Sequence, residues 1–121
     1  MPLQLAAISA MSEKTDKYLE QTRETYYNRA VFLQKELKNK LDWEVDLPKA
    51  TMFIWAKIPE KFKDISSFDF CDQLIKETGV ALSPGSSFGS KGDGFVRFSL
   101  IHDDKRTIEA IDRMKIFFDK F

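Results

Sequence analysis

The candidate chemistry of this chain centres on one arginine in an apolar stretch. Arg97 lies in the run Phe95–Leu100, where apolar residues alternate as they do in a strand with one buried face. On such a strand Arg97 shares the opposite face with Phe95 and Ser99. A guanidinium among aromatic neighbours needs an anion, because burying an unpaired charge is costly. The sequence therefore predicts a carboxylate or similar anion beside Arg97.

Two kinds of anion could pair with Arg97. A local carboxylate such as Asp93 or Glu44 would make the arginine half of a structural ion pair. A substrate carboxylate would instead use the planar guanidinium, which offers two parallel charge-assisted hydrogen bonds that lysine cannot match. Composition alone favours the ion pair, and both interpretations stay open at this point.

A glycine-rich segment lies just before this strand. Gly85, Gly89, Gly92 and Gly94 make up four of the five glycines in the chain. Their spacing matches neither a phosphate-binding P-loop nor the dinucleotide-binding fingerprint, and a strand rather than a helix follows them. The segment is either a flexible hairpin connection or a lid that brings the backbone close to a ligand.

Other candidate chemistry is sparse. His102 is the only histidine and Cys71 the only cysteine, so the sequence offers no metal-ligand cluster and no internal disulfide. Cys71 falls on the buried side of its predicted helix, which argues against a nucleophilic pair with His102. We therefore expect no catalytic residue, no metal ligand and no cofactor ligand in this chain.

Composition indicates one domain of ordinary globular character. Of 121 residues, 43% are hydrophobic and 31% charged, and the 19 basic and 19 acidic residues cancel. Such a balance leaves no excess of positive charge that would attract nucleic acid or an anionic membrane. No apolar run approaches the roughly 18 residues of a membrane span, and the first residues lack a signal-peptide pattern. With a single cysteine, this predicts a cytoplasmic location.

Two helices are expected before any strand. Residues 2–11 are small and apolar on nearly every side, which is typical either of a helix packed on its own core or of a remnant of a larger neighbouring domain. Ser12 is expected to cap a second helix that runs to about Leu41. Its apolar stripe comprises Leu19, Thr22, Tyr26, Ala30, Leu33, Leu37 and Leu41. Some 30 residues span about 45 Å, which suits a connection between two domains.

The rest of the chain predicts a small sheet with helices. Strands are expected at Trp43–Val45, Thr51–Ile58 (an inner strand), Val80–Leu82 and Phe95–Leu100. A polar connection, Glu60–Ile65, leads to a helix expected to begin at Ser66 or Ser67 and to be closed by Gly79; its buried side comprises Phe70, Cys71, Leu74, Ile75 and Thr78. A last helix is expected to begin at Asp103 or Asp104, with a buried stripe of Ile108, Ile111, Met114, Phe117, Phe118 and Phe121. The fold class is then α+β: a long N-terminal interdomain helix followed by a small, mostly antiparallel sheet with helices packed on one side.

Several stretches resemble the class I/II aminotransferases, pyridoxal-phosphate enzymes of the aspartate aminotransferase type. The run Val80–Gly89, followed by Gly94–Leu100, is similar to the signature near their C-terminus. Pro48–Trp55 resembles the preceding strand, Tyr26–Ala30 the middle of their interdomain helix, and Pro2–Ile8 the large-domain helix before it. The similarity covers essentially the whole chain, and Pro-Gly-Ser-x-Phe-Gly with the arginine is its most specific part.

This resemblance implies roles for particular residues and partners. Arg97 matches the arginine that binds the α-carboxylate of the substrate. Pocket-lining or lid roles follow for Ala50, Phe53, Gly85, Phe88 and Gly89. The implied reaction transfers an amino group between an amino acid and a 2-oxo acid. The implied partners are a large domain that binds pyridoxal phosphate and a second subunit.

The family residues that contact the cofactor are missing from the sequence. The lysine that forms a Schiff base with the cofactor stands in a Ser-x-x-Lys context, and no serine here has a lysine three positions later. The large-domain aspartate and aromatic that contact the cofactor ring are also absent. We therefore expect a C-terminal fragment: residues 1–11 a remnant of a large-domain helix, residues 12–41 the interdomain helix and residues 42–121 the small domain. Alone, it should neither bind pyridoxal phosphate nor catalyse.

Two other classes of protein stay open. A free-standing α+β module that binds amino acids could also use Arg97 for carboxylates, although the long helix and apolar N-terminus argue against it. A protein-interaction module would carry Arg97 incidentally. The amino-acid-binding module would bind its ligand without cofactor, and the interaction module would bind neither.

Overall fold

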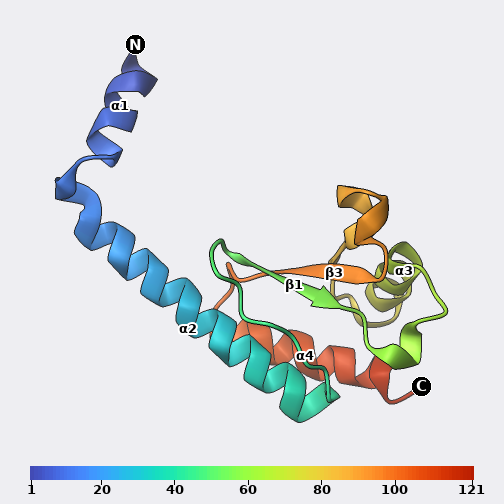
Figure 1. Ribbon diagram of the computed structural model, residues 1–121. Helices are drawn as coiled ribbons and strands as arrows, with labels where there is room; N and C mark the ends of the chain where they lie inside the picture. Colours follow the sequence, from blue (N-terminus) through green and yellow to red (C-terminus); the bar gives the residue numbers. More distant parts are fainter.

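The longest element is helix α2 (Asp16–Leu41), which runs from the sheet toward the N-terminus in the computed structural model of residues 1–121 (Figure 1). Four members of its predicted apolar stripe are buried against the rest of the chain: Ala30, Leu33, Leu37 and Leu41. Leu19 and Thr22, nearer the N-terminus, are exposed. The helix is therefore packed along its C-terminal half only, and neither it nor any other helix has the length and apolar character to cross a membrane.

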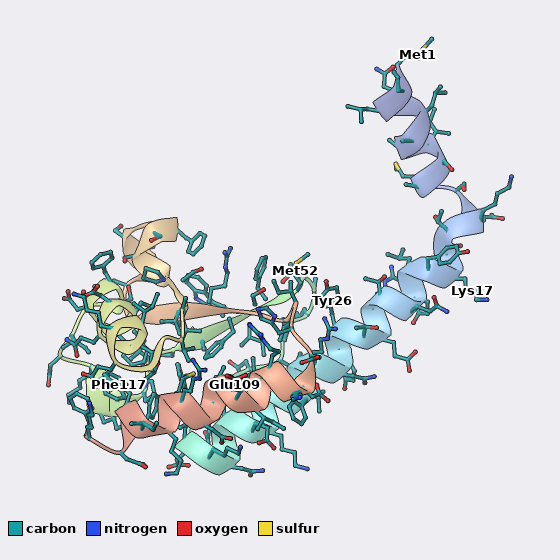
Figure 2. The ribbon with its side chains drawn as sticks, turned by 180° about the vertical axis from the view of Figure 1, so that it is seen from behind. Met1, Lys17, Tyr26, Met52, Glu109 and Phe117 are labelled. Atoms are coloured by element: carbon teal, nitrogen blue, oxygen red, sulfur yellow. The ribbon has the colours of Figure 1, made fainter.

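Helix α1 (Pro2–Ala10) projects beyond α2 and buries none of its residues (Figures 1 and 2). A 3-10 turn at Glu13–Thr15 separates the two helices. The Ser12 hydroxyl donates to the carbonyl of Ser9 (2.7 Å), and Thr15 Oγ1 donates to the carbonyl of Ala10 (2.7 Å). The expected continuous helix from Ser12 is wrong in its first turn, because these hydroxyls bond the carbonyls that end α1 instead of the amides that begin α2.

The sheet has three strands in the order β1-β3-β2, and both pairs are antiparallel. Strand β1 spans Phe53–Lys57, β2 spans Ser83–Pro84 and β3 spans Phe95–Ser99. The alternation predicted for β1 and β3 is confirmed, since Ile54, Ala56, Val96 and Phe98 are buried on one face. The centre of the sheet is β3, so the prediction that the 51–58 segment is an inner strand is wrong.

Two further strand predictions are wrong. Pairing in the third strand starts at Ser83 rather than in Val80–Leu82, and it ends with Pro84, a residue that edge strands tolerate because they have no partner on one side. Trp43–Val45 is extended but pairs with no strand. The carbonyl of Val45 accepts instead from Gln34 Nε2 of α2 (2.7 Å), and Trp43 Nε1 donates to the carbonyl of Lys57 (2.8 Å).

Helices α3 (Ser67–Thr78) and α4 (Asp104–Phe118) complete the layer beside the core face of the sheet, with α4 alongside α2 (Figure 1). Their predicted caps are confirmed. Ser66 Oγ accepts from the amide of Asp69 (3.0 Å), and the Asp103 carboxylate accepts from the amide of Arg106 (2.9 Å). Gly79 closes α3 in the left-handed conformation that glycine adopts readily. The α+β class is confirmed.

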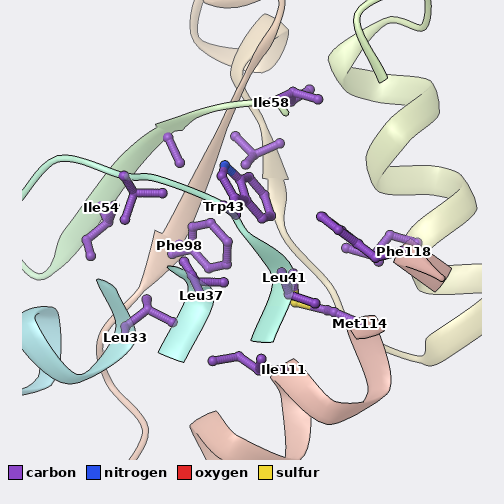
Figure 3. Packing of buried hydrophobic residues seen from close by; sticks show 14 of the residues in the cluster. Leu33, Leu37, Leu41, Trp43, Ile54, Ile58, Phe98, Ile111, Met114 and Phe118 are labelled. Atoms are coloured by element: carbon purple, nitrogen blue, oxygen red, sulfur yellow. The ribbon is translucent and has the colours of Figure 1, made fainter. Parts of the chain in front are cut away.

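The core gathers around Trp43, between the sheet and the helices (Figure 3). Its ring contacts Phe70, Phe98 and Phe118, with centroid distances of 6.1, 5.2 and 5.6 Å. Phe62 joins this cluster from a 3-10 turn in a segment that the sequence indicates only as a polar connection. Three predicted core positions are exposed instead: Ile75, Ile108 and Phe121. Trp43, just after the end of α2, thus packs against the sheet that carries Arg97.

Candidate carboxylate-binding site

Arg97 lies on the face of the sheet that points away from the core. In the register of the sheet it stands opposite Trp55 of β1 and Ser83 of β2. Trp55 is 42% exposed, and its ring stacks on that of Phe95 with centroids 5.7 Å apart. Helices α2 and α4 pack on the opposite, core face, and Phe88 from the turn after β2 reaches this one. The site is therefore an open aromatic surface with one cation at its centre.

Two phenyl rings flank the guanidinium of Arg97. Its central carbon lies 4.1 Å from the ring centroid of Phe53 and 4.5 Å from that of Phe88, both within cation–π range. Nη2 also makes a long contact of 3.5 Å with Ser83 Oγ. Apart from this contact with Ser83, the N–H donors of the guanidinium have no hydrogen-bond partner in the chain and are available to an acceptor such as a carboxylate.

No carboxylate of the chain pairs with Arg97. Glu44 forms an ion pair with Lys38 (2.7 Å), and Asp93 accepts hydrogen bonds from Ser67. The structural ion pair that composition favours is therefore absent. A partly buried arginine with stacked faces and no internal anion is the arrangement expected of a site that receives a carboxylate from outside the chain.

The segment between β2 and β3 is folded into two short 3-10 turns, Gly85–Phe88 and Ser90–Gly92. The turns meet through backbone atoms at two glycines. A Cβ atom on Gly85 would lie 2.1 Å from the carbonyl oxygen of Gly92, and one on Gly92 equally close to that of Gly85. Both glycines are therefore required by this close approach, and the segment is more ordered than a flexible hairpin connection.

Hydrogen bonds to the buried residue Ser67 hold this segment to α3. The Asp93 carboxylate accepts from the amide and hydroxyl of Ser67, at 2.8 and 2.9 Å, and from the amide of Gly94 at 3.1 Å. Ser67 Oγ in turn accepts from the amide of Ser86 (3.2 Å). The hydrogen bonds from Ser67 hold the pKa of Asp93 below its ordinary value. The sequence does not predict this contact between Ser67 and Asp93, because it spans 26 residues and leaves no local pattern.

The five other residues with expected pocket or lid roles lie in three places: beside Arg97, in the loop between β2 and β3, and at a separate hollow. Phe53 and Phe88 lie at Arg97, whereas Gly85 is buried in the loop contact and Gly89 is exposed. Ala50 lines a separate hollow of about 600 Å³ between α2 and the 47–52 segment, near Tyr26 and Met52 (Figure 2). The structure thus brings two of these five residues together with Arg97.

Gly85→Ala should loosen the loop contact. The added methyl group would collide with the backbone of Gly92, and overpacking of this kind typically costs about 1–3 kcal/mol of stability. We expect a lower urea midpoint for this variant than for Gly89→Ala, whose Cβ meets nothing within 4 Å although its φ of 128° is unfavourable for alanine. An equal or smaller loss for Gly85→Ala would contradict the close backbone approach.

Two of the four helix N-termini, which are common phosphate sites, are already capped by side chains of the chain. Ser66 and Asp93 accept from amides of α3, and Asp103 accepts from an amide of α4. No serine of the chain is followed by lysine at the third position. The structure also contains no group of three or more acidic, histidine or cysteine side chains placed to hold a metal ion. The arrangement offers a cation whose N–H donors pair with no carboxylate of the chain, which suits the binding of a carboxylate.

Comparison with known proteins places these features in one family. A family model described as aminotransferase class I and II matches residues 1–114. The glutamate-pyruvate aminotransferase AlaC of Escherichia coli is 41% identical over 117 residues, and an LL-diaminopimelate aminotransferase of Halothermothrix orenii is 36% identical over 113 residues. These matches cover 97% and 93% of this chain, but the chain spans only 28% of either relative.

Solved structures give the same result. An aromatic aminotransferase from Pyrococcus horikoshii superposes with a TM-score of 0.81 at 30% identity. The match covers 95% of this chain and 30% of that structure. An aminotransferase from Staphylococcus aureus superposes with a TM-score of 0.80 at 29% identity, over 97% of this chain and 30% of the other. The range matched by the family model, residues 1–114, includes the projecting helices and the sheet.

Proposed function

Because the chain belongs to the class I and II aminotransferases, we propose that it is the C-terminal part of a pyridoxal-phosphate-dependent transaminase and that Arg97 binds the substrate α-carboxylate. The observation that carries this proposal is the arrangement of Arg97 itself. Its guanidinium has an aromatic ring on each of two sides and no carboxylate partner within the chain. In a transaminase both the amino acid and the 2-oxo acid bring a carboxylate to be held.

In this proposal the chain supplies orientation rather than bond making. Two parallel hydrogen bonds from Arg97 fix the carboxylate end of the substrate, which sets the direction of the Cα–H bond relative to groups outside the chain. The aromatic surface formed by Phe53, Trp55, Phe88 and Phe95 offers apolar contact beside this carboxylate. Because the chain lacks a lysine in the Ser-x-x-Lys context, the chemistry at Cα belongs to residues beyond these 121.

The exposed apolar helices support a larger assembly. Leu3, Leu5 and Ile8 of α1 are all more than half exposed, and residues 16–25 of α2 are all exposed as well. Such surfaces are typical of protein interfaces. We propose that a cofactor-binding large domain covers this region, with a second subunit completing the enzyme, and that α2 connects the two domains.

A chimeric enzyme tests the proposal. In it, the 117 aligned residues of this chain replace the matching segment of the E. coli aminotransferase AlaC. We expect this chimera to bind pyridoxal phosphate and to transfer amino groups between glutamate and pyruvate, whereas the isolated chain should develop no cofactor absorbance band and no activity. A folded, cofactor-loaded chimera without activity, or cofactor binding by the isolated chain, would contradict the proposal. An isolated chain that binds amino acids tightly would indicate an amino-acid-binding module instead.

A further inference from the structure

Phe88 holds an unusual position for an exposed aromatic residue on a loop. Its side chain is 54% exposed, yet its ring lies 4.5 Å from the guanidinium carbon of Arg97 and 5.8 Å from the ring of Trp55. A loop phenylalanine with this much exposure has little burial energy to hold it in place. Its position over Arg97 must therefore come from the loop backbone.

That backbone is fixed from both ends by one buried residue. Ser67, fully buried at the start of α3, accepts from the amide of Ser86 through its hydroxyl oxygen. The same hydroxyl donates to Asp93, beyond the second turn of the loop. Ser86 and Asp93 bracket Phe88, and the close contact between Gly85 and Gly92 draws the two ends of the loop together. The loop can therefore hardly shift at Phe88 without breaking these hydrogen bonds.

We propose that Asp93, acting through Ser67 and the loop backbone, and Phe88, acting through its ring, are positioning residues that pre-organise Arg97 for the substrate carboxylate. This inference rests on the proposed function, which gives Arg97 that carboxylate. A flexible arginine must be ordered when it binds, and that ordering weakens affinity. Stacked between Phe53 and Phe88, the guanidinium is ordered before the substrate arrives.

Kinetics of the chimeric enzyme test this inference. Immobilising a long side chain is equivalent to about two- to tenfold in affinity, so Asp93→Asn and Phe88→Leu should each raise KM for the amino acid by about that factor with a smaller change in kcat. Phe88→Tyr keeps a ring over the guanidinium and should recover most of the loss. Asp69→Asn is the matched control, since Asp69 lies in the same first turn of α3 but contacts only Ser66.

A spectroscopic readout separates positioning from general destabilisation. In the 121-residue chain labelled with ¹⁵N-arginine, the Arg97 Nε–H signal should move toward free-arginine values in Asp93→Asn and Phe88→Leu. It should stay in place in Asp69→Asn and Phe88→Tyr. Unchanged Arg97 signals and KM values in the first two variants would overturn the inference.

The two proposals fail in different ways. If Arg97→Ala raises KM while the Phe88 and Asp93 variants do not, the carboxylate role stands and the positioning role is wrong. If Arg97→Ala leaves KM unchanged, the proposed function is wrong, whatever the arginine signals show about the loop.

Discussion

Arg97→Ala should lower kcat/KM of the chimeric transaminase by roughly thirtyfold to several-thousandfold. Truncating one partner of a hydrogen-bonded charge pair costs about 2–5 kcal/mol, and each 1.4 kcal/mol is about tenfold. Most of the loss should appear as a higher KM for the amino acid, because the variant keeps every group that touches the cofactor. Steady-state kinetics together with a pyridoxal phosphate titration measure both quantities.

Two further variants make this result specific. Arg97→Lys keeps the charge but loses the planar pair of donors, so its kcat/KM should remain well below that of the unsubstituted enzyme. Arg106→Ala removes an exposed arginine of α4 that makes no side-chain hydrogen bond or ion pair, and it should have no effect on KM. A loss of cofactor affinity as large as the loss in kcat/KM would mean that Arg97 supports the enzyme in another way.

Trp43→Ala should produce the largest loss of stability among single substitutions in the core. Trp43 is 2% exposed, packs against three phenylalanines and donates through Nε1 to the carbonyl of Lys57. Truncating a buried tryptophan costs about 3–5 kcal/mol, a large part of the roughly 5–15 kcal/mol that stabilises a typical domain. The free energy of unfolding in urea, followed by circular dichroism, provides the measurement.

Trp55→Ala is the matched control for this substitution. It removes the same atoms from a side chain that is 42% exposed on the open face of the sheet. The loss of stability should be clearly smaller than for Trp43→Ala, because the ring leaves no sealed cavity behind. Similar losses for the two variants would show that the core does not depend on Trp43.

Local patterns in the sequence predicted the helices and their ends well. Ser66, Gly79 and Asp103 act as caps through bonds to residues four positions away or fewer, so the sequence alone carries that information. The alternation in β1 and β3 likewise follows from the two-residue period of a strand. Ser12 was misassigned as a cap because its hydroxyl had a competing local acceptor in α1.

Long-range contacts explain what the sequence did not predict. Trp43–Val45 has the residues of a strand, but α2 takes its backbone hydrogen bonds: the amide of Trp43 donates to the carbonyl of Leu37, and the carbonyl of Val45 accepts from Gln34. Phe62 lies among charged residues, and only the packing of α3 and α4 buries it. At the site, Arg97 was identified from its own strand, whereas the absence of an ion pair depends on where Glu44 and Asp93 find other partners.

The most direct test of the carboxylate role is a crystal structure of the chimeric enzyme with pyridoxal phosphate and a non-reactive amino acid analogue. We expect both carboxylate oxygens of the analogue to lie about 2.7–2.9 Å from guanidinium nitrogens of Arg97, with Phe53 and Phe88 still stacked on its faces. An analogue carboxylate bound elsewhere, with Arg97 paired to an acidic side chain of the large domain, would contradict the account.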